Sequence, residues 1–424
     1  MKKTKLALTI VAATTISTPV LATNGDVLIG LGAQARALGG SGTAAFYGAE
    51  NALSNPAILA KSEGNEFSFG GTLFMPKVKA TSDVSAPTTP SSATSSADTN
   101  LIPEVALSTR INENVVFGIG MFGSAGMGVN YRDTNSTANA ALFQAQSNLQ
   151  IMKFAPSLSY NSENYGFGFA PTLQYGQLDM NYKSGTTTVG SGAAQDLGFG
   201  YNVGGFYDIN KALTVALAYQ SAIGMKYQDQ ISVAAAGFGL TFTDDLEQPA
   251  EIKAGVAYNT GNWDLTLDAK QIKWADAKGY KDFGWQDQNV FALGAKFTGN
   301  NYWLGAGYNM GSDPIKKQGV GSTGADPASG GMTGYTAQAI DLFNNHFFPG
   351  IVETHITFGG GYKLTKNLTL EGAVVYAPEV KKTIDTGVVS SALGSSFAST
   401  ADAGTTHEVT HSQVSYTVSA RYNF

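Results

Sequence analysis

Residues 23–60 have the sequence TNGDVLIGLGAQARALGGSGTAAFYGAENALSNPAILA, which is rich in glycine and alanine and unlike the alternating segments that follow it. The stretch shows no sustained period-2 alternation, and its glycines disfavour a long helix. Asn55 can accept backbone N–H groups as a helix cap and Pro56 suits a first helical position, so a short helical turn is expected there. A compact segment of small residues ahead of many strands indicates either a plug inside a barrel or a frayed N-terminal arm.

The same stretch contains Arg36-Ala37, Gly39-Gly40-x-Gly42 and Asn55-Pro56-Ala57. This pattern resembles the N-terminal hatch of the FadL/TodX family of outer-membrane transporters, and later segments such as Gly305–Tyr308 resemble strands of that family. The resemblance implies a hatch over residues 23–62, with Arg36, Gly39, Asn55, Pro56 and Ala57 as its characteristic residues. It also implies passive uptake of long-chain fatty acids or aromatic hydrocarbons, with lateral release into the membrane.

Residues 1–22 have the features of a signal peptide. Lys2, Lys3 and Lys5 precede an apolar stretch from Leu6 to Ile16, and small residues follow near Ala22. The apolar stretch is too short to span a bilayer as a helix. We therefore expect residues 1–22 to be removed on export.

The composition favours a membrane barrel over a soluble protein. The chain has 51 glycines, 19 tyrosines and 23 phenylalanines, but only 14% of its residues are charged, against about 25% in soluble domains. Its mean hydropathy is close to zero, which is typical of alternating lipid-facing and lumen-facing residues. A net charge of −6 gives no basic face for nucleic acid, and the absence of cysteine leaves no disulfide framework.

Residues 63–424 are predicted to form an all-β, antiparallel transmembrane barrel of about fourteen strands, with long and short connections in alternation. A soluble two-layer β-protein would have shorter strands and more charge. The expected strands are 66–79, 101–111, 114–131, 149–161, 164–183, 197–208, 212–230, 249–259, 262–277, 285–299, 302–312, 352–364, 367–379 and 409–424. Short turns and both termini then fall on the periplasmic side.

Two motifs suggest chemistry that their context does not support. His407 to His411 match H-E-x-x-H, but on a strand the two histidines lie roughly 13 Å apart and cannot share a zinc ion. Gly118 to Gly123 match G-x-G-x-x-G without the following helix of a dinucleotide site. We therefore predict no enzyme activity, no metal and no cofactor.

The interior should carry mixed charges that pair with each other and with the plug, where Arg36 is a candidate partner. A lysine among them could instead bind a ligand carboxylate. Phasing the strands by their aromatic face places inward Glu104, Arg110, Glu251, Lys253, Asp264, Asp268, Lys270, Lys296, Glu371 and Arg421.

Two outer loops, 234–242 and 340–351, are unusually apolar. They could form a landing groove for a hydrophobic ligand, or they could pack on each other as the core of a lid. The candidate ligand-binding residues are Val27, Leu28, Ile29, Phe343, Phe347 and Phe348.

Residues 115–131 are the candidate lateral exit. The phase places Val115, Phe117, Ile119, Met121, Ala125, Met127 and Val129 toward lipid, and its kink residues are Gly118, Gly120, Phe122, Gly123, Gly126 and Gly128. Glycines weaken a strand and mark a bulge or a close backbone approach, so this strand could bend inward and open the wall, where Phe122 could cover the gap. The family resemblance implies a kink in the third strand. Alternatively, the glycines only make room for the plug.

The sequence thus predicts a multi-pass protein of a Gram-negative outer membrane that takes up hydrophobic small molecules. The alternatives are a porin-type channel for polar solutes and a structural or adhesive surface protein. Expected partners are the ligand, membrane lipid and lipopolysaccharide. The terminal Phe424 resembles a signal for the barrel-assembly machinery, and a monomer is expected.

Overall fold

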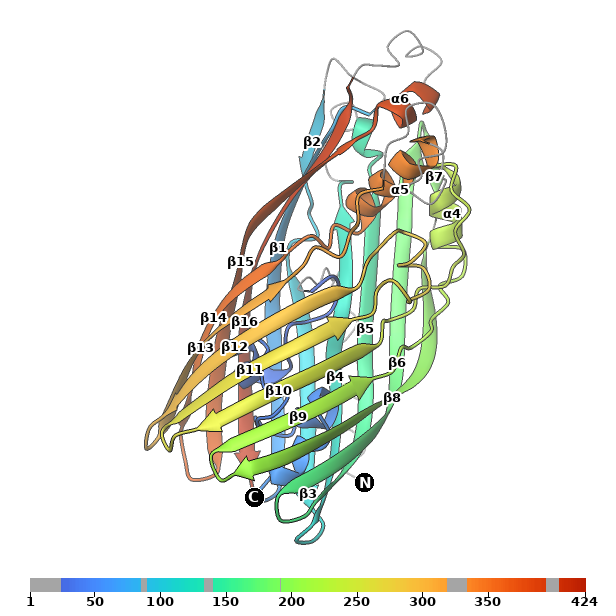
Figure 1. Cartoon of the computed structure of the whole chain (residues 1–424). Coiled ribbons are helices and arrows are strands. Elements are labelled where there is room, and N and C mark those ends of the chain that lie inside the picture. The colour runs from blue at the N-terminus through green and yellow to red at the C-terminus, as the bar shows by residue number, and fades with distance from the viewer. Residues whose placement is uncertain (1–23, 85–89, 133–139, 191, 319–333, 394–403) are drawn as a thin grey trace, which may run out of the picture.

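The computed structural model describes residues 24–84, 90–132, 140–190, 192–318, 334–393 and 404–424, so the predicted signal peptide lies outside the described residues. The chain forms a closed antiparallel barrel of fourteen long strands, as predicted (Figure 1). The wall strands are β1 (Glu66–Ser82), β3 (Asn100–Arg110), β4 (Val115–Asn130), β5 (Gln146–Asn161), β6 (Tyr165–Ser184), β8 (Ala193–Asn210), β9 (Leu213–Gln220), β10 (Glu251–Asn259), β11 (Trp263–Ile272), β12 (Gln288–Thr298), β13 (Tyr302–Gly311), β14 (Thr354–Lys363), β15 (Leu368–Asp385) and β16 (Thr406–Asn423).

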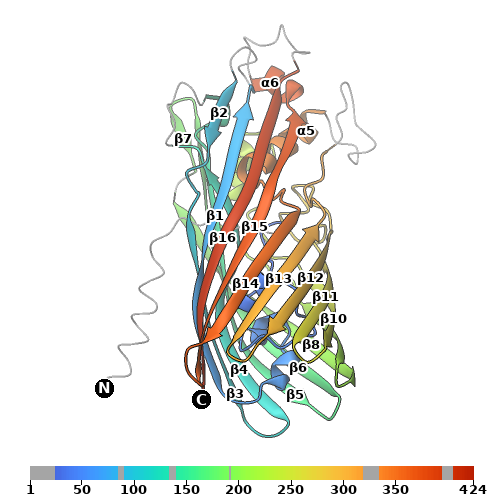
Figure 2. The same ribbon diagram turned by 90° about the vertical axis from the view of Figure 1, so that its left-hand side faces the viewer.

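Each wall strand pairs with its neighbours along the chain, and the barrel closes because β1 also pairs with the last strand, β16, from Glu66↔Asn423 to Ser82↔His407. Both strands face the viewer in Figure 2. The short turns and the C-terminus lie at one end, which we call the turn end, and the long connections lie at the other, the loop end. Short strands β2 (Ser91–Thr94) and β7 (Thr187–Val189) extend the loop end. No helix in the described part of the chain is long and apolar enough to cross a membrane.

Two predicted strands are too long. The strand expected over 212–230 ends at Gln220, and the one expected over 262–277 ends at Ile272. Beyond Gln220 the chain leaves the wall and forms isolated bridges such as Ile223↔Gln248. Ile223, Met225 and Tyr227 are buried there, and Trp274 is buried in the same cluster. An alternating apolar pattern predicts that one face of the strand is shielded from water, but it does not show whether lipid or the protein interior covers that face.

The outward face of the wall has the expected apolar band. Phe67, Phe69, Leu73 and Met75 alternate with buried residues along β1 and are 37–55% exposed. On β16, Tyr416, Val418 and Tyr422 lie outward while Thr417, Ser419 and Arg421 are buried. This apolar-out, polar-in alternation is that of a membrane barrel.

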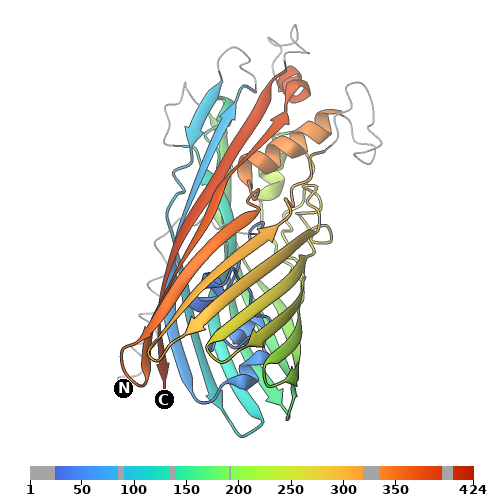
Figure 3. The same cartoon turned by 60° about the vertical axis from the view of Figure 1, so that its left-hand side comes forward.

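Residues 24–62, which we call the N-terminal segment, lie inside the barrel toward the turn end (Figure 3). Its helices α2 (Gly32–Ala37), α3 (Asn51–Ser54) and the 3-10 turn η1 (Ile58–Lys61) contact different sides of the wall. Wall glycines allow this close approach. A side chain at Gly168 of β6 would meet the backbone of Pro56 and Ala57, and one at Gly307 of β13 would meet that of Leu38 and Gly39.

The loop end is closed by an apolar cap. It includes α4 (Ile231–Ala236) and α5 (Gly334–Phe347), with η2 (Ala140–Leu142) and α6 (Gly387–Leu393) nearby (Figure 1). Phe343 stands at its centre and lies 5.5 to 5.9 Å, ring to ring, from Phe238, Phe242 and Phe283. The cap is therefore a packed hydrophobic core of its own.

Candidate functional site

The predicted hatch residues all contact the wall or brace the segment. Arg36 of α2 donates to Glu104 of β3 at 2.5 Å and also contacts Thr72. The Gly39 N–H donates to Thr357 Oγ1 at 2.9 Å. The expected pairing of Arg36 with an interior carboxylate is present, and both side chains are buried, so removing one would leave an uncompensated charge.

Asn55 has two roles. Its Oδ1 accepts the Ala57 N–H at 3.1 Å, and its Nδ2 donates to the Thr43 carbonyl at 2.7 Å. The turn that follows is a 3-10 helix rather than an α-helix, and the Pro56 carbonyl accepts from Ser159 of β5. Asn55 thus ties two parts of the segment together next to the wall.

Other interior charges pair as expected. Arg421 of β16 donates to Glu50 of the segment at 3.2 Å and to Glu371 of β15 at 3.0 Å, and it also contacts Glu66. Asp268 of β11 accepts from the N–H groups of Gly42 and Thr43 at 2.9 and 2.8 Å. The segment is thereby held at several points around its circumference.

Two of the predicted interior charges lie nearer the turn end. Arg110 binds backbone carbonyls of Ala60, Ser62 and Glu113 instead of a carboxylate. Lys296 pairs with Asp264 at 3.0 Å, with the aspartate half-buried. These groups brace the segment and the rim of the wall.

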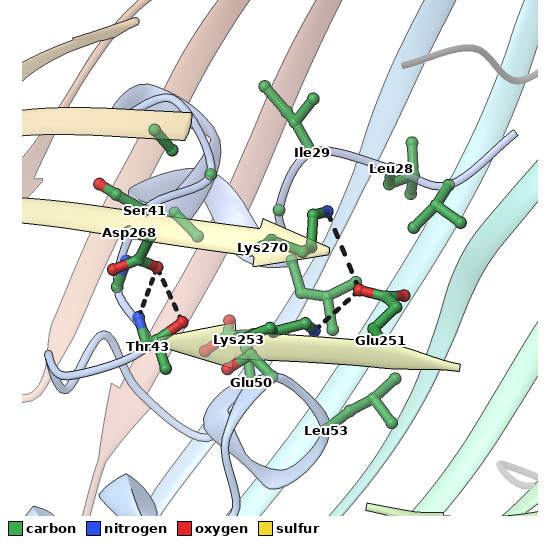
Figure 4. A pocket seen from close by; sticks show the side chains of 18 of the residues that line it. Leu28, Ile29, Ser41, Thr43, Glu50, Leu53, Glu251, Lys253, Asp268 and Lys270 are labelled. Atoms are coloured by element: carbon green, nitrogen blue, oxygen red, sulfur yellow. Dashed lines mark hydrogen bonds and ion pairs between the residues drawn. The ribbon is translucent and has the colours of Figure 1, made fainter. Parts of the chain in front are cut away.

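A cavity of about 90 Å³ lies between the segment and the wall, with room for several water molecules. Its lining includes three of the predicted ligand-binding residues, Val27, Leu28 and Ile29 (Figure 4). Facing these apolar side chains are Lys253 and Lys270, which approach Glu251 at 3.2 and 3.9 Å. The cavity therefore has an apolar side and a charged side.

Lys153 of β5 also lines the cavity, and sequence analysis missed it. It is 4% exposed and, within the described residues, makes no hydrogen bond or ion pair. The side chains of β5 alternate between inward and outward, and Lys153 directly precedes the outward Phe154. This alternation is the signal that could have placed Lys153 inside the barrel. The lining also includes the carboxylates Glu50, Glu251 and Asp268, equal in number to the three lysines. Lys153, which forms no ion pair with the residues described, is the cation open to an anionic group.

Strand β4 contains a bulge at Ser124. Its pairing with β5 shifts between Gly123↔Met152 and Ala125↔Ile151, so Ser124 is an extra residue. A bulge reverses which side chains face inward. Ala125, Met127 and Val129 are consequently buried with Leu149 and Ile151, and the prediction that they face lipid is wrong.

Gly126 and Gly128 alternate with the residues predicted to face lipid, so the same phase predicts that they face the lumen, and this is wrong for the same reason. Gly118 does lie inward, where a side chain would meet Leu59 and Ala52 of the segment. A side chain at Gly128 would instead meet the Ser147 carbonyl of the adjacent strand. Making room for the segment therefore explains Gly118, whereas Gly128 serves the close pairing of β4 with β5 beyond the bulge.

The ladder between β3 and β4 is incomplete. In the described residues it runs from Arg110↔Val116 to Glu104↔Phe122 and stops there. Beyond it, the segment pairs with β4 instead: Leu28 donates to the Ser124 carbonyl at 3.1 Å, and Gly126 donates to the Asp26 carbonyl at 3.0 Å. Backbone groups exposed to lipid are costly, so a break in the wall at this depth needs such partners.

Phe122 lies at the end of this ladder. Its side chain is fully buried and packs with Leu53 and Ala106 inside the barrel. Gly120 and Gly123 flank it: a side chain at Gly120 would meet the Phe122 ring, and one at Gly123 would meet Ile102 of β3. Phe122 thus stands beside the break, between wall and segment.

The three predicted landing residues, Phe343, Phe347 and Phe348, are at most 1% exposed. They pack within the cap, as in the lid alternative, and none lines the cavity described above. The cap reaches the segment through Asp26, which accepts from Gln248 at 2.8 Å and from Tyr280. The same residue therefore contacts both the cap and β4.

Residues 28–321 match the protein family described as outer membrane protein transport protein (OMPP1/FadL/TodX). A 47 kDa outer membrane protein of Pasteurella multocida is 22% identical over 204 residues, a match that spans 44% of this chain and 45% of that protein. The chain thus covers about half the length of this curated relative.

Solved structures share the fold at lower identity. The P. putida toluene transporter TodX has a TM-score of 0.63 at 18% identity, covering 94% of this chain and 99% of TodX. A Pseudomonas aeruginosa FadL homologue has a TM-score of 0.66 at 13% identity, covering 94% and 100%. At such identities the likeness establishes the fold.

Proposed function

We propose, since this chain belongs to the OMPP1/FadL/TodX family of outer membrane transport proteins, that it takes up hydrophobic small molecules passively and releases them laterally through the barrel wall. In an outer-membrane barrel the short turns lie on the periplasmic side and the long loops lie on the outer side, so the turn end is periplasmic and the loop end faces outward. The observation that carries the proposal is the incomplete β3–β4 ladder, which stops at Glu104↔Phe122 beside the bulge at Ser124.

The route follows from this break. The segment residues Asp26 and Leu28 hold the free edge of β4 by two backbone hydrogen bonds. A ligand in the cavity touches Leu28, so displacing residues 26–28 would free that edge at the cost of about two hydrogen bonds, each worth about 1 kcal/mol net. The apolar ligand would then leave sideways into the hydrocarbon.

The charged side of the cavity bears on which ligand is carried. A long-chain carboxylate could place its head among Lys153, Lys253 and Lys270 and its chain along Leu28 and Ile29. An aromatic hydrocarbon has no group for these lysines. The arrangement therefore favours fatty acids between the two ligand classes.

The N-terminal segment acts as the hatch in this proposal. It lies inside the barrel (Figure 3) and is held there by Arg36–Glu104 and by the Arg421 cluster, an obstruction that a porin does not need. Removing residues 24–54 should raise ion leakage and abolish ligand uptake. Unchanged conductance with unchanged uptake would refute the hatch role.

The remaining partners are also proposals. Phe424 is exposed, stacks on Tyr422 at 6.0 Å between ring centroids and donates its N–H to Asn65, so its ring is accessible to the barrel-assembly machinery. Contacts with lipopolysaccharide and function as a monomer complete the proposal.

Proteoliposome uptake of labelled oleate and of toluene tests the function. Oleate should accumulate, and Lys153→Met should lower oleate uptake without changing toluene entry. Lys382→Met is the matched control, because Lys382 pairs with Asp313 and does not line the cavity. A large, steady ohmic pore in planar bilayers, with no accumulation of either ligand, would overturn the transporter.

A further inference from the structure

The outward face of β1 changes character abruptly along its length. From the periplasmic end it presents Phe67, Phe69, Leu73 and Met75, and then the exposed lysines Lys77 and Lys79. Phe67 to Met75 spans roughly 26 Å along the strand at about 3.3 Å per residue, or roughly 20 Å of height at the tilt of about 40° of barrel strands, which is most of an apolar band about 25 Å tall. The two lysines therefore stand just above the hydrocarbon on the outer side.

A third lysine joins them from two strands away. Lys79 pairs with Thr410 of β16, and Thr410 pairs with Lys381 of β15, so these three residues form one row across the wall. Strands lie about 4.8 Å apart, which places the Cα atoms of Lys79 and Lys381 roughly 10 Å from each other. Lys77, Lys79 and Lys381 together are called the lysine patch.

The patch directly overlies a row of apolar residues. Met75, Val414 and Tyr376 are paired across the same three strands, two residues nearer the membrane than Lys77 and four nearer than Lys79 on β1. A tyrosine such as Tyr376 marks the level of the lipid head groups. The lysine patch thus lies at the depth of the outer-leaflet head groups rather than in the loops beyond them.

This face of the wall also carries two carboxylates, Glu408 and the exposed Glu379 of the β15 bulge, so three lysines and two carboxylates leave a net charge of about +1. Lys381, 60% exposed in its side chain, pairs with Glu408 at 2.6 Å. Lys77 and Lys79 make no ion pair within the part of the chain that the structure describes. Hydroxyl groups lie beside them: Thr81 and Ser92 are hydrogen-bonded at 3.0 Å, and Ser412 pairs with Lys77. Unpaired ammonium groups with neighbouring hydroxyls can bind phosphate oxygens.

The geometry points to the lysine patch as a binding site for the phosphate groups of the phosphorylated glycolipid of the outer leaflet, lipopolysaccharide. Its acyl chains lie along Phe69, Leu73 and Met75, while its phosphates meet Lys77 and Lys79. The Glu408 contact holds Lys381 beside them. The proposed site depends only on the location of the protein in the outer membrane and not on the transported ligand. An experiment that refuted the uptake route would therefore leave this proposal untouched.

The test is a titration of the detergent-solubilised protein with bis-phosphorylated lipid A, followed by native mass spectrometry and by the shift in melting temperature. Each lysine near an anionic surface contributes about 1 kcal/mol, or about fivefold in affinity, so Lys77→Gln with Lys79→Gln should weaken binding roughly thirtyfold. Lys77→Arg with Lys79→Arg should retain it. Heat-modifiable mobility on gels confirms that each variant is folded.

The matched control is Lys211→Gln with Lys366→Gln, which makes the same charge change in two exposed periplasmic turns. This pair should leave lipid A affinity at the parental value. Dephosphorylated lipid A should bind the parent as weakly as the double glutamine variant does. Parental affinity in the K77Q/K79Q variant, or equal binding of the dephosphorylated lipid, would overturn the assignment.

Discussion

Deleting Ser124 should close the lateral route without disturbing the rest of the barrel. Ser124 is the extra residue of the β4 bulge, so its removal joins Gly123↔Met152 directly to Ala125↔Ile151 and leaves all other pairs unchanged. Straightened in this way, β4 can pair with residues 100–103 of β3, which at present pair only with β1. The wall would then be continuous.

The size of the effect follows from the hydrogen bonds gained. Extending the β3–β4 ladder over residues 100–103 would add about three hydrogen bonds, because Pro103 has no N–H to donate. At about 1 kcal/mol per hydrogen bond, the free energy needed to open the wall rises by about 3 kcal/mol. If the break is the exit, uptake should fall roughly a hundredfold.

The assay is oleate uptake into proteoliposomes at matched protein content, with heat-modifiable mobility as the measure of folding. Deletion of Ile209 is the matched control, since it repairs a second register shift, between Asp208 and Asn210, far from the break. That control should transport normally. A folded Ser124 deletion that transports at the parental rate would refute lateral exit between β3 and β4.

Three further outcomes are expected. Arg36→Met should lower the free energy of unfolding in urea by about 3–5 kcal/mol, because Glu104 is left charged and buried. Adding Glu104→Leu should restore much of this loss. Equal stability of R36M and the parent would contradict a structural role for the pair. Replacing Phe343, Phe347 and Phe348 with Ser should speed hydrogen exchange in α5, because the packing of the cap is lost. The same variant should take up ligand more slowly, most of all at low ligand concentration. An equal reduction of the uptake rate at every ligand concentration would argue against capture by the cap. Burial raises the pKa of Asp341 in α5 to about 7, so the stability that this residue gives the cap is full below about pH 4 and is lost as pH rises toward 7 and above. The protection factors of α5, which are exchange rates corrected for the intrinsic base-catalysed rate, should therefore be lower at pH 8 than at pH 5. D341N should remove this difference in protection, and an unchanged pH dependence of protection in D341N would disprove the assignment.

The fold could be predicted because each wall strand alternates between two very different surroundings. Phe67, Phe69 and Leu73 lie in lipid, and Ser68 and Thr72 lie inside, so period-2 alternation predicted both strands and faces. The alternation failed at Ala125, Met127 and Val129. These side chains face the apolar core beneath the cap, and an apolar residue suits that core as well as it suits lipid.

The site was less predictable for a related reason. Arg36 and Asn55 were found by their family pattern, and Val27 to Ile29 by their isolated apolar character. Lys153 was missed although the alternation of β5 places it on the inward face, next to the outward Phe154. Lys253 and Lys270 pair directly across the β10–β11 hairpin, whereas Lys153 lies on β5, far away in sequence, and reaches Glu251 only across the folded barrel.

The contacts of the N-terminal segment have a consequence for assembly. The segment precedes β1, yet all 17 residues of β1 pair with the last strand, β16. Its anchors lie on β3, β11, β14 and β16, at Glu104, Asp268, Thr357 and Arg421. The segment must therefore be enclosed before the final seam forms. As a nascent sheet curls around the segment, each of these contacts would form only when the sheet reaches the curvature of the finished barrel. The segment would therefore act as a template for the number of strands and for the register in which β1 and β16 pair.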